Sequence, residues 1–273
     1  MANRIAMALA AHPDDIEFMM AGTLTLLRQE GFETHYMNLS SGSCGSLEHT
    51  ADRLRQIRRK EAEAAAQTLG ARFHPSLGED LEIFYELPLL RQLAAIIRNV
   101  RPSILLVPSP QDYMEDHTNV SRLAVTAAFA RGLKNFATDP ATKPITTDLT
   151  VYHAMPHGLR DPLRRRIIPG SYVDIRSVMK RKRLALAQHK SQARWLDTSQ
   201  KMDSYLESME HFARELGQLS HSFTHAEGWR RRLHYGFCQE GADPLKDALG
   251  NKMMINAAYE AELDQPNNSF QGN

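Results

Sequence analysis

A cluster of metal-binding and proton-accepting residues stands near the N-terminus, in segment 11–17 (Ala-His-Pro-Asp-Asp-Ile-Glu). His12 and Asp15 are three positions apart, so both side chains can turn toward one cation while Asp14 stays free beside them. Hydrolytic zinc sites need protein ligands, an open coordination position and a carboxylate that accepts a proton from water. The segment therefore predicts metal-assisted hydrolysis, with His12 and Asp15 as ligands and Asp14 as the general base.

The position of this cluster supports the same interpretation. It directly follows an apolar run over residues 5–10, which predicts a buried strand, and it precedes a predicted helix. Chemistry in open α/β sheets collects at such carboxyl ends of strands. A simpler interpretation is that Asp14 or Asp15 caps the helix. A cap needs only one acid, however, and it leaves His12 without a role.

A third ligand follows a second strand-like run, over residues 103–107. His117 comes after the next loop, at the start of a predicted helix. Because catalytic zinc usually takes three protein ligands plus water, we expect one zinc per chain, bound by His12, Asp15 and His117. Asp116 could orient a ligand or a general acid. The alternative is that Asp116 caps the helix and His117 lies on a solvated first turn.

Two further segments follow predicted strand ends. Segment 40–46 (Ser-Ser-Gly-Ser-Cys-Gly-Ser) lacks the lysine and the glycine spacing of nucleotide-binding loops. We expect it to be an active-site loop in which Ser41 and Gly42 contact substrate hydroxyls. His153 and His157 follow the fifth predicted strand, and we expect one of them to reach the site, although either could be structural.

The elements that must position these residues alternate along the chain. Strands are predicted at 4–11, 33–40, 71–76, 103–108 and 149–154, and helices at 15–30, 50–69, 86–100, 117–134, 177–192 and 200–217. This alternation predicts an α/β fold, a Rossmann-like and mostly parallel sheet with helices on both faces. We expect a metal-binding core over 1–155. A smaller C-terminal cap region, 156–255, would complete the same domain and cover the site, followed by a flexible tail over 256–273.

Composition narrows the class of protein. The 273 residues are 42% hydrophobic, enough to bury a substantial core, and the formal net charge of +1 implies no nucleic-acid partner. Two cysteines are too few for a disulfide framework. No apolar run approaches the ~20 residues that a membrane helix needs, and no secretion signal is evident. We therefore expect no membrane partner and a cytoplasmic location.

Several motifs together resemble the PIG-L/LmbE-type zinc-dependent N-acetylglucosaminyl de-N-acetylases. Segment 11–17 is similar to the Ala-His-Pro-Asp-Asp-x-Glu signature of that family, and Asp116-His117 to the end of its His-Pro-Asp-His signature. Further similar positions are Arg58, Glu61, Leu69-Gly70, Asp80, Tyr172 to Ile175, Lys182, Lys190 to Gln192 and Ala226 to Trp229. The resemblance covers all but roughly the last 25 residues.

The resemblance implies zinc-dependent hydrolysis of an N-acetyl amide on an N-acetylglucosamine-type sugar or glycoconjugate, and it suggests a homo-oligomer. It also implies that Arg58 and Asp80 bind substrate. One position departs from the family pattern, because Met114 replaces the histidine that commonly serves as the general acid, and methionine cannot donate a proton. We expect His157 to be the first candidate for that acid and His153 the second. Two alternatives stay open, a metal-dependent amidase acting on a non-sugar acyl amide and a non-catalytic sugar-binding homologue.

Overall fold

A mostly parallel sheet forms the centre of the computed structural model, which describes residues 3–200, 205–263 and 265. The sheet has eight strands in the order β3-β2-β1-β4-β5-β7-β6-β8. Its parallel part comprises β1 (Ile5–Ala10), β2 (Glu33–Asn38), β3 (Arg72–His74), β4 (Ile104–Val107) and β5 (Thr150–Ala154). Antiparallel pairing adds β6 (Ser171–Asp174), β7 (Ala226–Arg231) and β8 (Met253–Ile255). The predicted α/β class is therefore confirmed.

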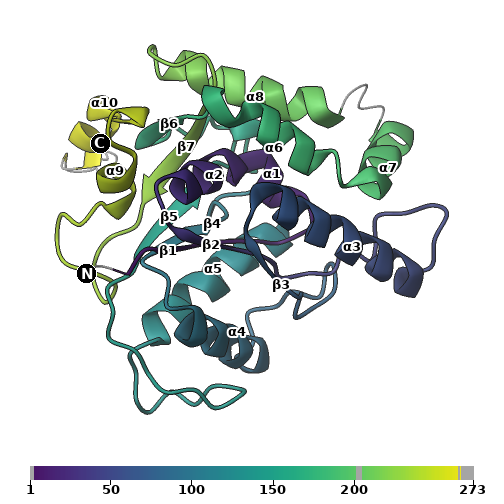
Figure 1. Cartoon of the computed structure of the whole chain (residues 1–273), viewed down its shortest axis with the longest axis horizontal. Coiled ribbons are helices and arrows are strands. Elements are labelled where there is room, and N and C mark those ends of the chain that lie inside the picture. Colours follow the sequence, from purple (N-terminus) through teal and green to yellow (C-terminus); the bar gives the residue numbers. More distant parts are fainter. Residues whose placement is uncertain (1–2, 201–204, 264, 266–273) are drawn as a thin grey trace, which may run out of the picture.

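Helices cover both faces of this sheet (Figure 1). One face carries α4 (Leu87–Val100) and α5 (Glu115–Ala130). The opposite face carries α1 (Asp15–Met19), α2 (Ala21–Gln29), α3 (Ala51–Leu69), α6 (Met179–Leu186) and α8 (Tyr205–Leu219). None of the helices in the described part of the chain is long and apolar enough to cross a membrane.

Strand β1 is the centre of the packing. Ala6, Ala8 and Ala10 belong to the core under α2, α3 and α6, whereas Met7 and Leu9 belong to the core under α4 and α5. Side chains alternate across a strand, so a strand covered on both faces reads as a continuous apolar run. This is the physical reason why the run over residues 5–10 marks the strand that leads into the site.

The site lies at β1, where the order of the strands across the sheet reverses. Strand β1 pairs with β2 on one side and with β4 on the other. The two loops that leave the carboxyl ends of β1 and β4 therefore diverge, and a crevice opens between them. His12 lies in the first loop and His117 lies just beyond the second, so the topology brings together residues 105 positions apart.

The C-terminal part of the chain extends the sheet and packs over its α2 side. In addition to β6–β8, it contains α7 (Lys190–Gln200), α9 (Pro244–Leu249) and α10 (Ala257–Leu263), with short 3-10 turns at His157–Leu159, Arg176–Val178 and Gly250–Lys252. Helix α10 occupies part of the region where we expected a flexible tail. The rest of that prediction, at 264 and 266–273, lies outside the described residues.

A buried ion pair ties the C-terminal part to the start of α2. The Glu227 carboxylate accepts hydrogen bonds from the backbone N–H groups of Gly22 (2.8 Å) and Thr23 (2.7 Å), and from the Lys182 ammonium. Glu227 and Lys182 are each 1% exposed. A carboxylate stabilises the positive end of a helix, and a buried charge needs its partner. Both residues belong to motifs that are similar to those of the family. Their contacts stabilise the fold and do not form part of the site.

Candidate metal centre and active site

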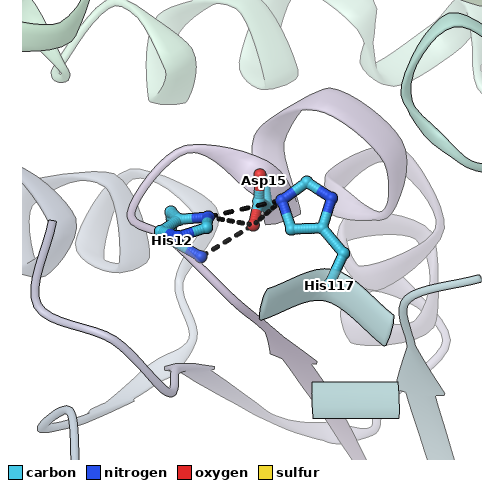
Figure 2. A group of neighbouring side chains, drawn as sticks. All are labelled: His12, Asp15 and His117. Carbon is cyan, nitrogen blue, oxygen red and sulfur yellow. Dashed lines mark hydrogen bonds and ion pairs between the residues drawn. The ribbon is translucent and has the colours of Figure 1, made fainter. Parts of the chain in front are cut away.

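Three potential metal ligands converge at the carboxyl ends of β1 and β4. His12 comes from the loop after β1, Asp15 from the first residue of α1, and His117 from the first turn of α5 (Figure 2). His12 Nδ1 lies 3.3 Å from His117 Nε2. Asp15 Oδ2 lies 3.5 Å from His12 Nδ1 and 3.3 Å from His117 Nε2. One ligand atom from each residue thus falls within 4.8 Å of the other two.

Each histidine has a carboxylate on its far nitrogen. His12 Nε2 lies 2.9 Å from Asp116 Oδ2, and His117 Nδ1 lies 2.9 Å from Asp112 Oδ1. A carboxylate accepts the imidazole N–H and so directs the lone pair of the other nitrogen toward the centre of the group. We assigned no role to Asp112 from the sequence, although it stands only five positions before His117.

The electrostatics of the group favour a positive charge at its centre. Burial lowers the pKa of His12, but hydrogen bonds to Asp116 and Asp15 outweigh it and raise that pKa to about 9. Burial likewise opposes protonation of His117, yet the negative charge of Asp15 raises its pKa well above the ordinary value. The neighbouring carboxylates therefore stabilise positive charge among the ligand atoms. A divalent cation supplies such a charge, so the donor set fits a metal.

Asp14 lies beside these ligands but turns toward different partners. Its backbone φ of 108° falls in the left-handed region, which is costly for a residue other than glycine and which clusters at functional sites. The Tyr205 hydroxyl donates a hydrogen bond to Asp14 Oδ2, and Arg58 Nη2 lies 3.7 Å from Asp14 Oδ1. Burial raises the pKa of Asp14, and the positive charge of Arg58 lowers it in part. A raised pKa makes a carboxylate a better proton acceptor near neutral pH.

Tyr205 is a residue that we missed in the sequence. It begins α8, it is 3% exposed, and it stands 191 positions from Asp14. Its ring packs edge-to-face on Phe18, with 5.2 Å between the ring centroids. No local motif marks such a long-range contact, so only the fold could have identified it.

Arg58, which we expected to bind substrate, faces the same space as Asp14. The Arg58 guanidinium donates hydrogen bonds to the carbonyl oxygen of Pro13 and to the side-chain oxygen of Gln192. Arg58 is only 2% exposed. It therefore holds the loop of Asp14 in place, and it also lies at the edge of the cavity described below.

Asp80 organises the loop after β2. Its Oδ1 accepts hydrogen bonds from Ser40 Oγ and from the Gly42 N–H, both at 2.7 Å, and its Oδ2 accepts one from the Cys44 N–H at 2.9 Å. Both carboxylate oxygens are thus engaged by the loop. The expected contribution of Asp80 to substrate binding would come largely through the loop that it shapes.

Ser41 and Gly42 do not line the cavity over the metal ligands, whereas Cys44 of the same loop does. Ser41 Oγ donates a hydrogen bond to Glu79. A Cβ atom at Gly42, whose φ is 77°, would lie 2.6 Å from the Arg58 side chain. The two residues therefore stabilise the loop through contacts with Glu79 and Arg58. They do not reach the cavity in which we expect the substrate.

His157 is the histidine after β5 that reaches the cavity. Its ring lies against Phe18 and Phe212, with centroid separations of 5.2 and 5.0 Å. Burial lowers the pKa of His157 below its ordinary value. The neutral form of the imidazole is therefore favoured, and its N–H can donate a hydrogen bond.

His153 lies on β5 itself and does not line the cavity. Its Nδ1 lies 2.9 Å from the carbonyl oxygen of Pro108 and 3.2 Å from Ser121 Oγ. Burial lowers the pKa of His153 to about 4. These contacts connect β5 to the loop after β4, which is a structural role rather than the acid role that we considered.

The low pKa of His153 predicts a loss of stability in acid. Below pH ~6.5, the ordinary histidine pKa, His153 is protonated in the unfolded chain, whereas in the native chain it is protonated only near pH 4. The free energy of unfolding should therefore decrease as the pH is lowered through this window, by on the order of 3 kcal/mol from this group. His153→Asn keeps a donor for Pro108 but removes the titration. Denaturant unfolding at several pH values should show a shallower decline in this variant, and parallel declines would contradict the assignment.

A cavity of about 290 Å³ opens over the three potential metal ligands. The carboxylates, histidines and arginine that line it are His12, Asp14, Asp15, Arg58, Asp80, His117 and His157. The apolar and aromatic lining residues are Phe18, Leu81, Tyr113, Met114, Trp195 and Leu196. Met114 is among them, so the position at which the family pattern has a histidine still faces this cavity.

Comparisons with known proteins identify relatives of this chain. A diacetylchitobiose deacetylase of Thermococcus kodakarensis is 29% identical over 193 residues, 68% of this chain and 69% of that protein. A 4-oxalmesaconate hydratase of Pseudomonas putida is 30% identical over 192 residues, 66% of this chain and 71% of that protein. The solved structure of an N,N'-diacetylchitobiose deacetylase from Pyrococcus horikoshii superimposes with a TM-score of 0.71 at 24% identity, covering 84% of each chain.

The relatives are enzymes, and they carry out more than one reaction on this fold. The PIG-L family model, described as GlcNAc-PI de-N-acetylase, matches residues 7–128, which include His12, Asp15 and His117. This match contains both strand ends that supply the three potential metal ligands. Together with a relative 30% identical across 71% of its own length, it shows that the chain belongs to the PIG-L family.

Proposed function

We propose that this protein is a zinc-dependent hydrolase that removes the acetyl group from an N-acetylglucosamine-type sugar or glycoconjugate. The observation that carries the proposal is the convergence of His12, Asp15 and His117 beside a buried Asp14. The deacetylase relatives support this reaction. Two histidines and one carboxylate also suit other divalent metals, so zinc itself is part of the proposal.

His12, Asp15 and His117 would hold the metal, and three protein ligands are the number that catalytic zinc sites commonly use. The metal would supply Lewis acidity, which makes water a nucleophile at neutral pH and polarises the substrate carbonyl. Asp112 and Asp116 keep both imidazoles in the tautomer that ligation requires. This gives Asp116 a role as an orienting group rather than a proton carrier.

Asp14 would take the proton from the attacking water and return it to the nitrogen of the departing amine. This double role follows from Met114, which cannot donate a proton. Tyr205 and Arg58 fix the Asp14 carboxylate from two sides, so it needs little reorganisation during the reaction. Neutral His157 can donate its N–H to the oxygen that gains charge in the transition state.

Removing the Tyr205 hydroxyl should slow the reaction without removing the metal. Tyr205→Phe keeps the packing on Phe18 but deletes the hydrogen bond to Asp14, and a bond to a charged group contributes about 1.5–3 kcal/mol. We expect kcat to fall by about 10-fold or more, with unchanged KM and zinc content. Tyr36→Phe is the matched control, because its buried hydroxyl donates to Glu17 at 3.1 Å instead. A wild-type kcat in Tyr205→Phe would rule out the positioning role.

Hydration of a double bond is the second reaction found among the relatives. That relative is named for an anionic substrate, so its kind of site should offer spare cations. Among the described residues that line the cavity, Arg58 alone carries a permanent positive charge, and Pro13 and Gln192 already accept its hydrogen bonds. The lining therefore favours an uncharged sugar over a polycarboxylate.

A substrate panel tests the proposed function. The zinc-loaded protein should release primary amine from N-acetylglucosamine or diacetylchitobiose, and should leave non-sugar acyl amides and 4-oxalmesaconate unchanged. Amine release from the acyl amides alone would indicate a general amidase. Conversion of 4-oxalmesaconate would assign the hydratase reaction. Sugar binding without any amine release would indicate a binding protein that has lost turnover.

A further inference from the structure

A second cavity, of about 220 Å³, lies beside the catalytic one, and we call it the distal cavity. The two cavities share Trp195 as a lining residue. They also follow the same two segments, because Gly45 and Gln192 line the catalytic cavity while their neighbours Ser46 and Ser191 line the distal one. The cavities are therefore successive parts of one crevice between loop 44–49 and α7.

A narrow waist separates the two parts. A Cβ atom at Gly45 would lie 3.2 Å from Gln192 Oε1 and 3.5 Å from Trp195 Cδ1. Glycine at this position thus allows the loop to approach α7 closely. An elongated ligand could cross the waist over the Trp195 ring and occupy both parts.

The walls of the distal cavity are anchored. Glu61 on α3 accepts hydrogen bonds from the Ser191 N–H (2.9 Å) and Ser191 Oγ (2.6 Å), which fixes the start of α7. Ser46 Oγ accepts from the N–H groups of Glu48 and His49, each at 3.1 Å, which fixes the loop. The cavity therefore belongs to a built part of the fold.

The lining of the distal cavity is mixed in character. Leu47, Ile57 and Trp195 offer apolar surface, whereas His49 and Lys190 offer hydrogen-bonding groups. Glu48 and Arg194, which also line it, form an ion pair with 3.3 Å between Oε2 and Nη1. Charges of both signs suit neither an anion nor a lipid. Apolar C–H faces and many hydroxyl groups, as in a sugar ring, match such a lining.

We propose that the distal cavity binds the sugar ring joined to the reacting N-acetylated ring, so that the preferred substrate is at least a disaccharide. This inference rests on the proposed function and specifies its substrate class. Each cavity alone lies below the ~300–1,000 Å³ of common ligand sites, whereas the two together fall within that range. The reacting ring lies over the metal ligands and its neighbour lies beyond Trp195.

The test compares N-acetylglucosamine with diacetylchitobiose by amine release from the zinc-loaded protein. Wild type should have a kcat/KM at least about tenfold higher for the disaccharide. Ile57→Trp fills the distal cavity, and should lower that preference about tenfold. Gln56→Trp is the matched control, because Gln56 is the exposed neighbour on α3 that lines neither cavity, and the preference should stay at the wild-type value.

A second variant guards against a folding defect. Leu47 is 73% exposed, so Leu47→Ala should fold normally and still reduce the preference for the disaccharide. Equal kcat/KM for the two sugars in wild type, or an unchanged preference in both variants, would overturn the distal site and leave the deacetylase function standing. If neither sugar is hydrolysed, calorimetry decides. Disaccharide binding that Ile57→Trp weakens supports the distal site without the reaction, and absent binding overturns it.

Discussion

Replacing His12 with alanine is expected to remove both the bound metal and the activity. His12 supplies one of three converging ligand atoms, and two ligands cannot hold the open tetrahedral site that a hydrolytic zinc needs. Losing several kcal/mol of transition-state stabilisation should reduce kcat/KM by about a thousandfold or more. Elemental analysis of the purified variant, together with amine release, measures both effects.

Two further variants serve as comparisons for the zinc content of His12→Ala. Asp116→Asn leaves the three ligands in place but weakens the orientation of His12, and should lower metal affinity by only about 10–100-fold. His153→Asn changes a buried histidine outside the cavity, and should keep its zinc. Full zinc occupancy in His12→Ala would show that the metal group has been assigned to the wrong residues.

Asp14→Asn is expected to abolish turnover while the zinc stays bound. An amide cannot accept the proton of the attacking water, and loss of a proton-transfer group costs roughly 10² to 10⁴ in rate. The metal should stay because the Asp14 side chain faces Tyr205 and Arg58 rather than the ligand atoms. Single-turnover kinetics and zinc analysis on the same sample separate the two properties.

The neighbouring carboxylate provides the contrast. Asp15→Asn removes a ligand whose oxygen lies 3.3 Å from His117 Nε2, so this variant should lose zinc as well as activity. If Asp14→Asn were found without metal and Asp15→Asn with it, the roles of base and ligand would be exchanged.

Much of the fold could be predicted because its central strands are buried on both faces. The five parallel strands lie within three residues of the predicted ends, since apolar runs bounded by polar residues leave little choice. Helix boundaries inside long patterns were less certain. The helix predicted over 15–30 divides at Met20, and the one predicted over 177–192 ends at Leu186 before α7 begins. At Met20 the backbone leaves the helical region, with a φ of −134°, so the helix is interrupted there.

The antiparallel strands β6, β7 and β8 lay outside the predicted elements. Their pairing partners are distant in the sequence. Local apolar patterns cannot indicate such pairings. The predicted C-terminal region therefore lacked the strands that extend the sheet.

The potential metal ligands His12, Asp15 and His117 could be predicted because they stand in two local clusters at strand ends. The parallel topology brings these strand ends together. The residues that position this group could not be predicted from the sequence. Tyr205 reaches Asp14 from 191 positions away, and loop 44–49 meets α7 only through the packing of the whole chain. Ser41 and Gly42 show the limit in the other direction, because Cys44 and Gly45 of the same loop line the cavity and these two residues do not.

The most direct test of the account is a zinc titration of the metal-stripped protein. Free amine released from diacetylchitobiose is measured after each sub-stoichiometric addition of zinc, and bound metal is measured in parallel. The account predicts no amine release at the start, a linear rise in rate with bound zinc, and a break at one zinc per chain. Full activity in the metal-stripped protein, or a rate that does not follow bound zinc, would contradict it.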